Sequence, residues 1–361
     1  MPPKLHSPRS SVDPPAIPLQ PDASRPFERD MPRWHGDGLA GRSLRFTVTL
    51  MAPMAVGLAL HQNYWLGYAL LTCILGFTLD SGGSARERAA LFATAGLVVL
   101  AGAALGSAVA GHLWLTATAL VATAALYALV EAVHPSAAFA ARFFCLATAI
   151  AALDVPFLPS DVGVVVLFAT YAWLVSVGWD VMTGLWRPST APTLAAIAAH
   201  VRATRGERLL FAGIVAVAVA ASFLVGRVLG LPHPHWAVFA VVIVLRDDSH
   251  FSRRMMVDLV LGTALGAGAA FLYGAFITSP AGLMAGLTLA ALVRWPGQRV
   301  HGALGMAAMT AFIILLLQLV GTLMSVPIYA AADRVVDVTL GCGFALVALV
   351  VNARLRRWLG W

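Results

Sequence analysis

Long apolar runs, separated by short polar segments, are the feature that most constrains this chain. Hydrophobic residues make up 60% of its 361 residues, and charged residues make up only 11%. A soluble domain carries about 25% charged residues, so this chain has too few charges to cover a water-exposed surface. Many of the runs approach the ~20 apolar residues that a helix needs to cross a bilayer. We therefore expect the lipid bilayer to be the principal surrounding of this protein.

Helices fit these runs better than β-strands. Within lipid, every backbone polar group must be satisfied inside the structure, which leaves α-helices and closed barrels. Barrel strands alternate in hydropathy over about ten residues, whereas these runs are continuous and rich in Ala, Leu, Val and Gly. The expected fold class is an all-α integral membrane protein with about twelve transmembrane helices. The segments are 46–60, 64–79, 91–110, 114–133, 139–153, 162–185, 209–229, 236–245, 259–277, 281–293, 303–323 and 335–351.

The positions of the basic residues support this count. Cytoplasmic loops of membrane proteins concentrate Lys and Arg. If both termini are cytoplasmic, twelve crossings leave only Arg227 and Arg334 on or near the outer side. We therefore expect a multi-pass protein of the bacterial inner membrane with both termini inside. The net charge of +7 is explained by these loop positions, so nucleic acid is not an expected partner.

A weak internal repeat divides the chain into two halves. Trp65 opens the second expected helix and Trp236 opens the eighth, and a turn with paired basic residues and a Gly/Ala-rich helix follow in each case. Two parallel six-helix repeats are an arrangement that transporters use. The expected parts are a disordered cytoplasmic tail (1–42), a first membrane repeat (43–186), a cytoplasmic linker (187–208), a second membrane repeat (209–353) and a basic cytoplasmic C-terminus (354–361).

Ionisable residues in apolar segments are candidates for function, because placing them in lipid is costly. Arg334 and Asp337 are three residues apart in the last segment, so they share one helix face. A guanidinium can receive a substrate carboxylate in a bidentate contact, and Asp337 can take up a proton. The alternative is an ion pair that only neutralises itself at the interface. Asp258 is a second candidate for proton coupling.

A dense charged turn follows the eighth segment. Within it, Asp248, Arg253 and Arg254 are candidates for a cytoplasmic gate, and the alternative is a solvated loop with local ion pairs. At the other end of the same segment, Trp236 is typical of the aromatic belt at a membrane interface. We include Trp236 with Arg334 as a candidate substrate-binding residue.

The sequence predicts neither a cofactor nor a metal site. The three cysteines lie singly inside apolar segments, and no Cys or carboxylate accompanies the two histidines that flank Pro234. A phosphate-binding Gly-rich loop, a nucleophile elbow and a zinc-protease motif are all missing from the sequence. We therefore do not expect an enzyme.

Four stretches of the second half are similar to those of a known family, and they are Pro-His-Trp-Ala at 234–237, Ser-Arg-Arg at 252–254, Leu-Gly-Thr-Ala-Leu-Gly-Ala at 261–267 and Asp-Arg-Val-Val-Asp-Val-Thr-Leu-Gly at 333–341. Through these stretches the second half resembles the fusaric acid resistance-like family, the aromatic acid exporters of inner membranes. The first half is similar only through Tyr64, Trp65 and its Gly/Ala-rich helix. Larger members carry a soluble cytoplasmic domain, whereas the expected linker here is short.

The resemblance implies proton-driven efflux of aromatic carboxylates or similar organic anions, often with a periplasmic adaptor. A homo-oligomer is compatible with this interpretation. A competing hypothesis is a non-transporting membrane scaffold or an assembly subunit in envelope biogenesis. It predicts co-purifying partners and no substrate-dependent flux. An intramembrane enzyme would need converging nucleophilic or metal-binding groups, and the sequence offers none.

Overall fold

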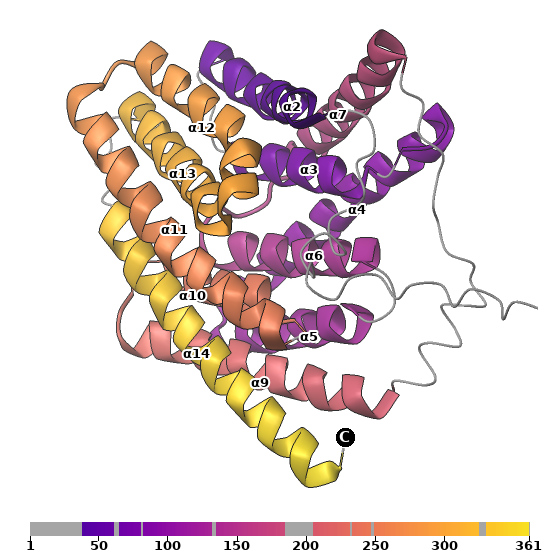
Figure 1. Ribbon diagram of the computed structural model, residues 1–361, viewed down its shortest axis with the longest axis vertical. Coiled ribbons are helices and arrows are strands. Elements are labelled where there is room, and N and C mark those ends of the chain that lie inside the picture. The colour runs from indigo at the N-terminus through magenta and orange to yellow at the C-terminus, as the bar shows by residue number, and fades with distance from the viewer. Residues whose placement is uncertain are drawn as a thin grey trace, which may run out of the picture. The chain divides into compact units, whose positions relative to one another are not determined.

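The computed structural model describes residues 38–60, 65–80, 82–131, 135–184, 205–231, 233–246, 249–324 and 330–360. Across these ranges the chain forms twelve α-helices and no β-strand (Figure 1). The helices are α2 (Gly38–Leu60), α3 (Leu66–Leu79), α4 (Ala85–Val109), α5 (Leu113–Glu131), α6 (Pro135–Leu153), α7 (Asp161–Thr183), α9 (Arg205–Val228), α10 (His235–Val244), α11 (Ser249–Phe276), α12 (Pro280–Val300), α13 (Gly302–Met324) and α14 (Ala330–Leu359). Each predicted segment corresponds to one of these helices, so the all-α fold class is confirmed.

Nine of the helices in the described ranges are long and apolar enough to cross a membrane. The chain is therefore a multi-pass membrane protein. The three others are α3, α10 and α12. Helix α12 is long, but it carries Arg294 and Arg299 in its last turns. The twelve expected crossings are thus not all full-length apolar spans.

Helices α3 and α10 are short because they lie inside the protein. With its 10 residues, α10 extends for about 15 Å at ~1.5 Å per residue, which is half of the ~30 Å hydrocarbon core. Eight of its residues are buried, and 10 of the 14 residues of α3 are buried as well. Extended backbone follows at Asp80 and Leu245. Non-helical backbone at membrane depth is tolerated where protein surrounds it.

Glycines allow the neighbouring long helices to pack closely. Helix α4 packs on α6, and α11 packs on α13. A Cβ on Gly102 would lie 2.6 Å from the carbonyl oxygen of Phe144, and one on Gly262 would lie 2.6 Å from that of Ala303. Gly106 and Gly266, one turn further on, are equally close to the backbone of the partner helix. Small residues bring helix backbones together in lipid, where dispersion forces drive packing.

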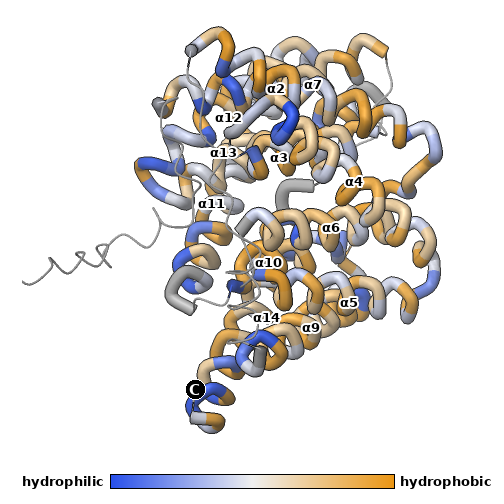
Figure 2. The backbone as a smooth tube through the Cα atoms, turned by 90° about the vertical axis from the view of Figure 1, so that its right-hand side faces the viewer, coloured by the Kyte–Doolittle hydropathy of each residue, from blue (hydrophilic) through white to orange (hydrophobic). Residues whose placement is uncertain are grey.

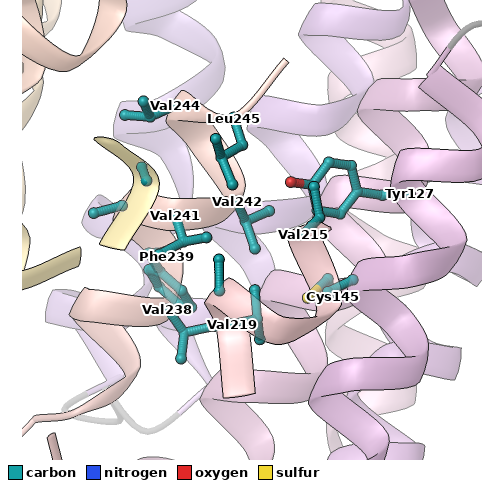
Figure 3. Packing of buried hydrophobic residues seen from close by; sticks show 14 of the residues in the cluster. Tyr127, Cys145, Val215, Val219, Val238, Phe239, Val241, Val242, Val244 and Leu245 are labelled. Atoms are coloured by element: carbon teal, nitrogen blue, oxygen red, sulfur yellow. The ribbon is translucent and has the colours of Figure 1, made fainter. Parts of the chain in front are cut away.

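The largest hydrophobic cluster surrounds α10. Val238, Val241 and Val242 of α10 are completely buried, and α5, α6, α9 and α14 contribute the residues around them. Figure 3 shows Tyr127 and Cys145 on the side of this cluster where Val215 also lies. A second cluster surrounds α3 and includes residues of α2, α7, α12 and α13. Each short helix is therefore the centre of a core.

The packing partners are similar in the two halves, α2–α7 and α9–α14. In the first half α3 contacts α7 and α4 contacts α7, while in the second half α10 contacts α14 and α11 contacts α14. Between the halves, α5 packs on α9, α12 packs on α2 and α10 packs on α6 (Figure 1).

Contacts between helix termini define two ends of the bundle. Arg45, Arg88 and Arg142 lie at one end, together with Asp80 and Asp180, and we name it the basic end. Asp154, His235 and Trp65 lie at the other, which we name the opposite end. In Figure 2 the hydrophilic colour lies mostly at helix ends and connections, with hydrophobic turns between them.

Several helices begin or end beyond the apolar runs. Residues 38–42 of the expected tail and 205–208 of the expected linker are helical, whereas 1–37 and 187–204 lie outside the described residues. Helix α4 begins at Ala85 because Ser84 and Glu87 form a capping box. The two residues satisfy free backbone N–H groups, which stabilises a polar first turn. Hydropathy therefore located the apolar part of this helix rather than its first residue.

Candidate functional site

Buried charged side chains gather at the C-terminal end of α3. Arg45 of α2, Asp80 after α3, Arg88 of α4 and Asp180 of α7 are each at most 2% exposed. We name these four residues the four-charge network. Their formal charges cancel, as buried charges must if they are not to impose a large desolvation cost. The network joins helices of the first half only.

Asp80 is the hub of this network. Its Oδ2 accepts hydrogen bonds from Arg45 Nη1 at 3.1 Å and from Ser176 Oγ at 2.5 Å. Its Oδ1 accepts from the backbone N–H of Gly82 at 3.2 Å and lies 3.6 Å from Arg88 Nε. Every one of these partners is a donor. The two oxygens of a carboxylate can accept several hydrogen bonds at once, and this capacity suits Asp80 to its place among these donors.

Arg88 connects Asp80 to α7. Its Nη2 donates to Asp180, and its Nη1 donates to the carbonyl and hydroxyl oxygens of Ser176 at 3.0 and 2.9 Å. Next to Asp80, the side chains pack so closely that no space admits a water-sized probe. The network is therefore tightly packed in this conformation.

Sequence reasoning missed this network. It placed every basic residue except Arg227 and Arg334 on the cytoplasmic side, and it did not connect Arg45 or Arg88 with a carboxylate. The missed signal was Asp80, which directly follows a short apolar segment and precedes Gly82 and Gly83, both with positive φ. Short or interrupted helices in transporters mark the places where polar sites form.

A second group of polar side chains lies at the N-terminal end of α10. It consists of Asp154, His235, Trp236 and Arg334, which we name the Trp236 cluster. The guanidinium carbon of Arg334 lies 3.8 Å from the centroid of the Trp236 ring, in the geometry of a cation–π contact. Arg334 is 7% exposed, and its Nε and Nη1 have no hydrogen-bond partner among the residues that the structure describes.

His235 connects this cluster to the first half. Its Nε2 lies 3.9 Å from Asp154 Oδ2, just beyond the end of α6, which is longer than a hydrogen bond. The imidazole is buried, whereas the side chain of Asp154 is 41% exposed. Partial burial raises the pKa of Asp154 above its ordinary value, and the nearby His233 opposes that shift.

The structure brings together three of the residues that the sequence singled out at this end. Trp236 and Arg334 are in contact, and Asp337 lies one turn along α14, fully buried and close enough to act electrostatically on Arg334. Gly341 lies one turn further on, where a Cβ would be 2.7 Å from the Cβ of Ala240. This glycine lets α14 approach α10 and so keeps Arg334 against Trp236.

The remaining predicted residues lie near the basic end. Asp258 of α11 is 4% exposed, and its Oδ1 is 3.6 Å from Nδ1 of His301. Arg253 and Arg254 are exposed at the start of α11, and Asp248 lies outside the described residues. The predicted substrate and gate residues therefore do not form one site. Asp258 and Asp337, the two proposed proton carriers, also lie apart.

Metal ligation finds little support in the parts of the chain described. Three or more His, Cys, Asp or Glu side chains do not come together there in a way that could hold an ion. Cys73, Cys145 and Cys342 are buried on separate helices as free thiols. They fill space in the cores, as small apolar residues do.

Residues 219–348 match the family described as fusaric acid resistance protein-like. The resemblance expected from the second half is therefore confirmed for this stretch, which runs from α9 into α14. The match contains Trp236, Arg334, Asp337 and the packing glycines Gly262 and Gly266. No curated protein and no solved structure matches the chain at a significant level.

Proposed function

We propose that this membrane protein exports aromatic carboxylates or similar organic anions, driven by the proton-motive force. Arg334 binds the carboxylate, and Trp236 provides a flat apolar surface for the ring. The observation that carries the proposal is the buried guanidinium of Arg334, with its Nε and Nη1 left without a protein partner among the described residues. Buried donors without a partner are costly, and a carboxylate would satisfy them.

The helix packing supports an architecture of two parallel repeats. The pairs α4–α6 and α11–α13 correspond, and so do α3–α7 and α10–α14. The contacts between the halves correspond too, since α5 packs on α9 as α12 packs on α2. Short helices at corresponding places in two halves are characteristic of transporter sites. In this arrangement the halves move against each other around α3 and α10.

The basic end is the cytoplasmic one in this proposal, because cytoplasmic loops concentrate Arg. Both termini then lie on the cytoplasmic side of an inner membrane, and the Trp236 cluster lies near the outer face. The exposed Arg253 and Arg254 attract anions to the cytoplasmic mouth. Asp337 and Asp258, both buried, carry the coupling proton. A membrane potential that is negative inside favours the exit of a monovalent anion by about 2.3 kcal/mol per 100 mV.

Partners beyond the bilayer follow from the same proposal. A periplasmic adaptor would receive the anion at the outer face, and a homo-oligomer is compatible with the exposed apolar helices. Neither a cofactor nor an enzymatic activity is part of the proposal. The proposed transport requires only that the protein binds an anion, moves it across the membrane and exchanges a proton.

Reconstituted vesicles test the proposal. The purified chain is placed in liposomes loaded with radiolabelled benzoate, and loss of label is followed with and without an imposed proton-motive force. We expect faster loss with the force, and its abolition by an uncoupler. Arg334→Gln should reduce the rate at least tenfold, because the amide lacks the charge and the fork of the guanidinium.

Arg227→Gln is the matched control. Arg227 is an exposed arginine near the same end of the bundle, so its loss should leave the rate within about twofold of that of the unmodified chain, as for most surface changes. Equal effects of the two variants would contradict the role of Arg334. If benzoate and related anions leave these liposomes no faster than they leave loaded liposomes without protein, the export proposal fails and the scaffold hypothesis is favoured.

A further inference from the structure

His235 is a buried imidazole at the start of α10 for which the transport proposal has no use. It is 1% exposed, and its ring lies 4.8 Å from that of Trp236 and 5.4 Å from that of Phe239, measured between centroids. It therefore borders the same indole on which Arg334 stacks. The charged and titratable groups around it are Asp154, His233 and Arg334.

One ring nitrogen of His235 has a neighbour and the other does not. Nε2 faces the carboxylate of Asp154 at 3.9 Å. Nδ1 is buried and has no hydrogen-bond partner in the described part of the protein. Buried polar atoms in native structures almost always have a partner. Nδ1 is thus available to a group that the chain itself does not supply.

The carboxylate also indicates which tautomer is favoured. A proton on Nε2 is attracted by Asp154, and the other nitrogen of a neutral imidazole is then an acceptor. Nδ1 would accordingly accept a hydrogen bond from an O–H or N–H group. Close by, Arg334 offers the opposite chemistry, with two unpartnered donors against the same Trp236.

We infer that His235 is a specificity-determining residue of the anion site, where Nδ1 accepts a hydrogen bond from a donor group of the substrate other than its carboxylate. The inference rests on the proposed function and adds a second recognition point to it. Arg334 binds the carboxylate, Trp236 and Phe239 contact the apolar body, and His235 selects anions that carry a donor. Asp154 acts as a positioning residue, because its carboxylate, 3.9 Å from Nε2, attracts a proton on that nitrogen.

Paired ligands and paired variants test this inference. Binding to the purified full chain in detergent is measured for benzoate, for the positional isomers of hydroxybenzoate and for their methyl ethers. A methyl ether cannot donate a hydrogen bond, but it keeps the ring and the carboxylate. The unmodified chain should bind at least one hydroxybenzoate about threefold to tenfold more tightly than its ether, as expected for one hydrogen bond.

Two amide substitutions separate the two nitrogens of the imidazole. The side-chain amide of His235→Asn reaches the place of Nδ1, whereas that of His235→Gln reaches the place of Nε2. We expect H235N to keep most of the preference for the hydroxyl and H235Q to lose it, where the preference is the ratio of the affinities for a hydroxybenzoate and for its methyl ether. The control H233Q, at the neighbouring and partly exposed histidine, should keep the preference.

The outcomes separate the inference from the function beneath it. Binding of benzoate without any preference for a hydroxyl would overturn the role of His235 and leave the export proposal standing. An equal loss of all ligands in H235N and H235Q would also overturn it, because that result indicates a purely structural residue. Failure of the unmodified chain to bind any of these anions would reject the anion site and the inference together.

Discussion

The two polar groups of this protein lie at opposite ends of two similar short helices and differ in what their arginines contact. The four-charge network follows the C-terminal end of α3, and the Trp236 cluster surrounds the N-terminal end of α10. In the network, each carboxylate receives at least one hydrogen bond from an arginine. In the cluster, Arg334 contacts a ring through its face, while two of its donors lack a partner in the described structure.

This difference separates a structural role from a binding role. Arginines and carboxylates that hydrogen-bond to one another hold their helices together. A buried guanidinium with unsatisfied donors costs stability, and such a cost is expected where a site is kept ready for a ligand. Burial of charge alone would have ranked the network first as a functional site, whereas the contact of Arg334 with an aromatic ring, in place of a carboxylate, favours the cluster.

The largest expected effect lies in the four-charge network. Arg88→Leu removes the donor to Asp180 and Ser176 and leaves a buried carboxylate without that partner. Breaking a buried ion pair typically costs about 3–5 kcal/mol, so thermal unfolding in detergent should shift strongly to lower temperature. Arg86→Leu, at an exposed arginine on the same helix, is the control and should have little effect.

A double substitution sharpens the same point. Arg88→Leu with Asp180→Leu removes both members of the pair, and apolar replacement of a whole buried pair is often close to neutral. We expect the double variant to be more stable than Arg88→Leu alone. An R88L protein as stable as R86L would contradict the assignment of a structural role to the network.

The next largest effect concerns a feature that the two halves share. Gly106→Ala and Gly266→Ala place a Cβ against the backbones of α6 and α13, and overpacking of this kind costs about 1–3 kcal/mol. Gly268→Ala is the control on the same helix, because a Cβ there meets no atom within 4 Å. Unfolding in detergent should be easier for the first two variants and unchanged or harder for the third. Unequal effects at positions 106 and 266 would argue against equivalent halves.

The smallest expected effect on stability lies in the Trp236 cluster. Arg334→Gln removes a guanidinium whose Nε and Nη1 lack a partner among the described residues, which favours stability. It also removes the positive charge that interacts electrostatically with Asp337, which opposes stability. We expect these opposing contributions to leave a change of about 1 kcal/mol or less, well below that for breaking a satisfied buried pair. The variant should still lose anion binding. A destabilisation as large as that of R88L would remove the distinction between the two groups.

The sequence predicted the helices better than the polar sites. All twelve apolar segments became helices, because long apolar runs in lipid have few alternatives. The sequence placed Arg334 and Trp236 in one candidate site without predicting a contact between them. In the structure the guanidinium carbon of Arg334 lies 3.8 Å from the centroid of the Trp236 ring. The network was missed, because Arg45, Asp80 and Asp180 are far apart in the chain and individually look like interface residues.

The count of membrane crossings also shows what the sequence predicts and what it misses. Hydropathy identified the segment of α10, but it could not say that this helix is surrounded by protein rather than lipid. Both environments favour the same residues, since a lipid chain is as apolar as a leucine side chain. Only the packing of α5, α6, α9 and α14 around α10 explains why ten residues suffice there.

Taken by itself, the sequence determined that this chain is a bundle of apolar helices in a membrane, with its basic residues gathered at the helix ends. Local hydropathy sets that outcome, and it requires no knowledge of which helices are neighbours. Tertiary structure alone decided which buried charges pair with one another and which arginine contacts an aromatic ring instead. Whether a buried charge stabilises the fold or binds a ligand depends on partners contributed by other helices, and those partners are fixed only when the helices pack.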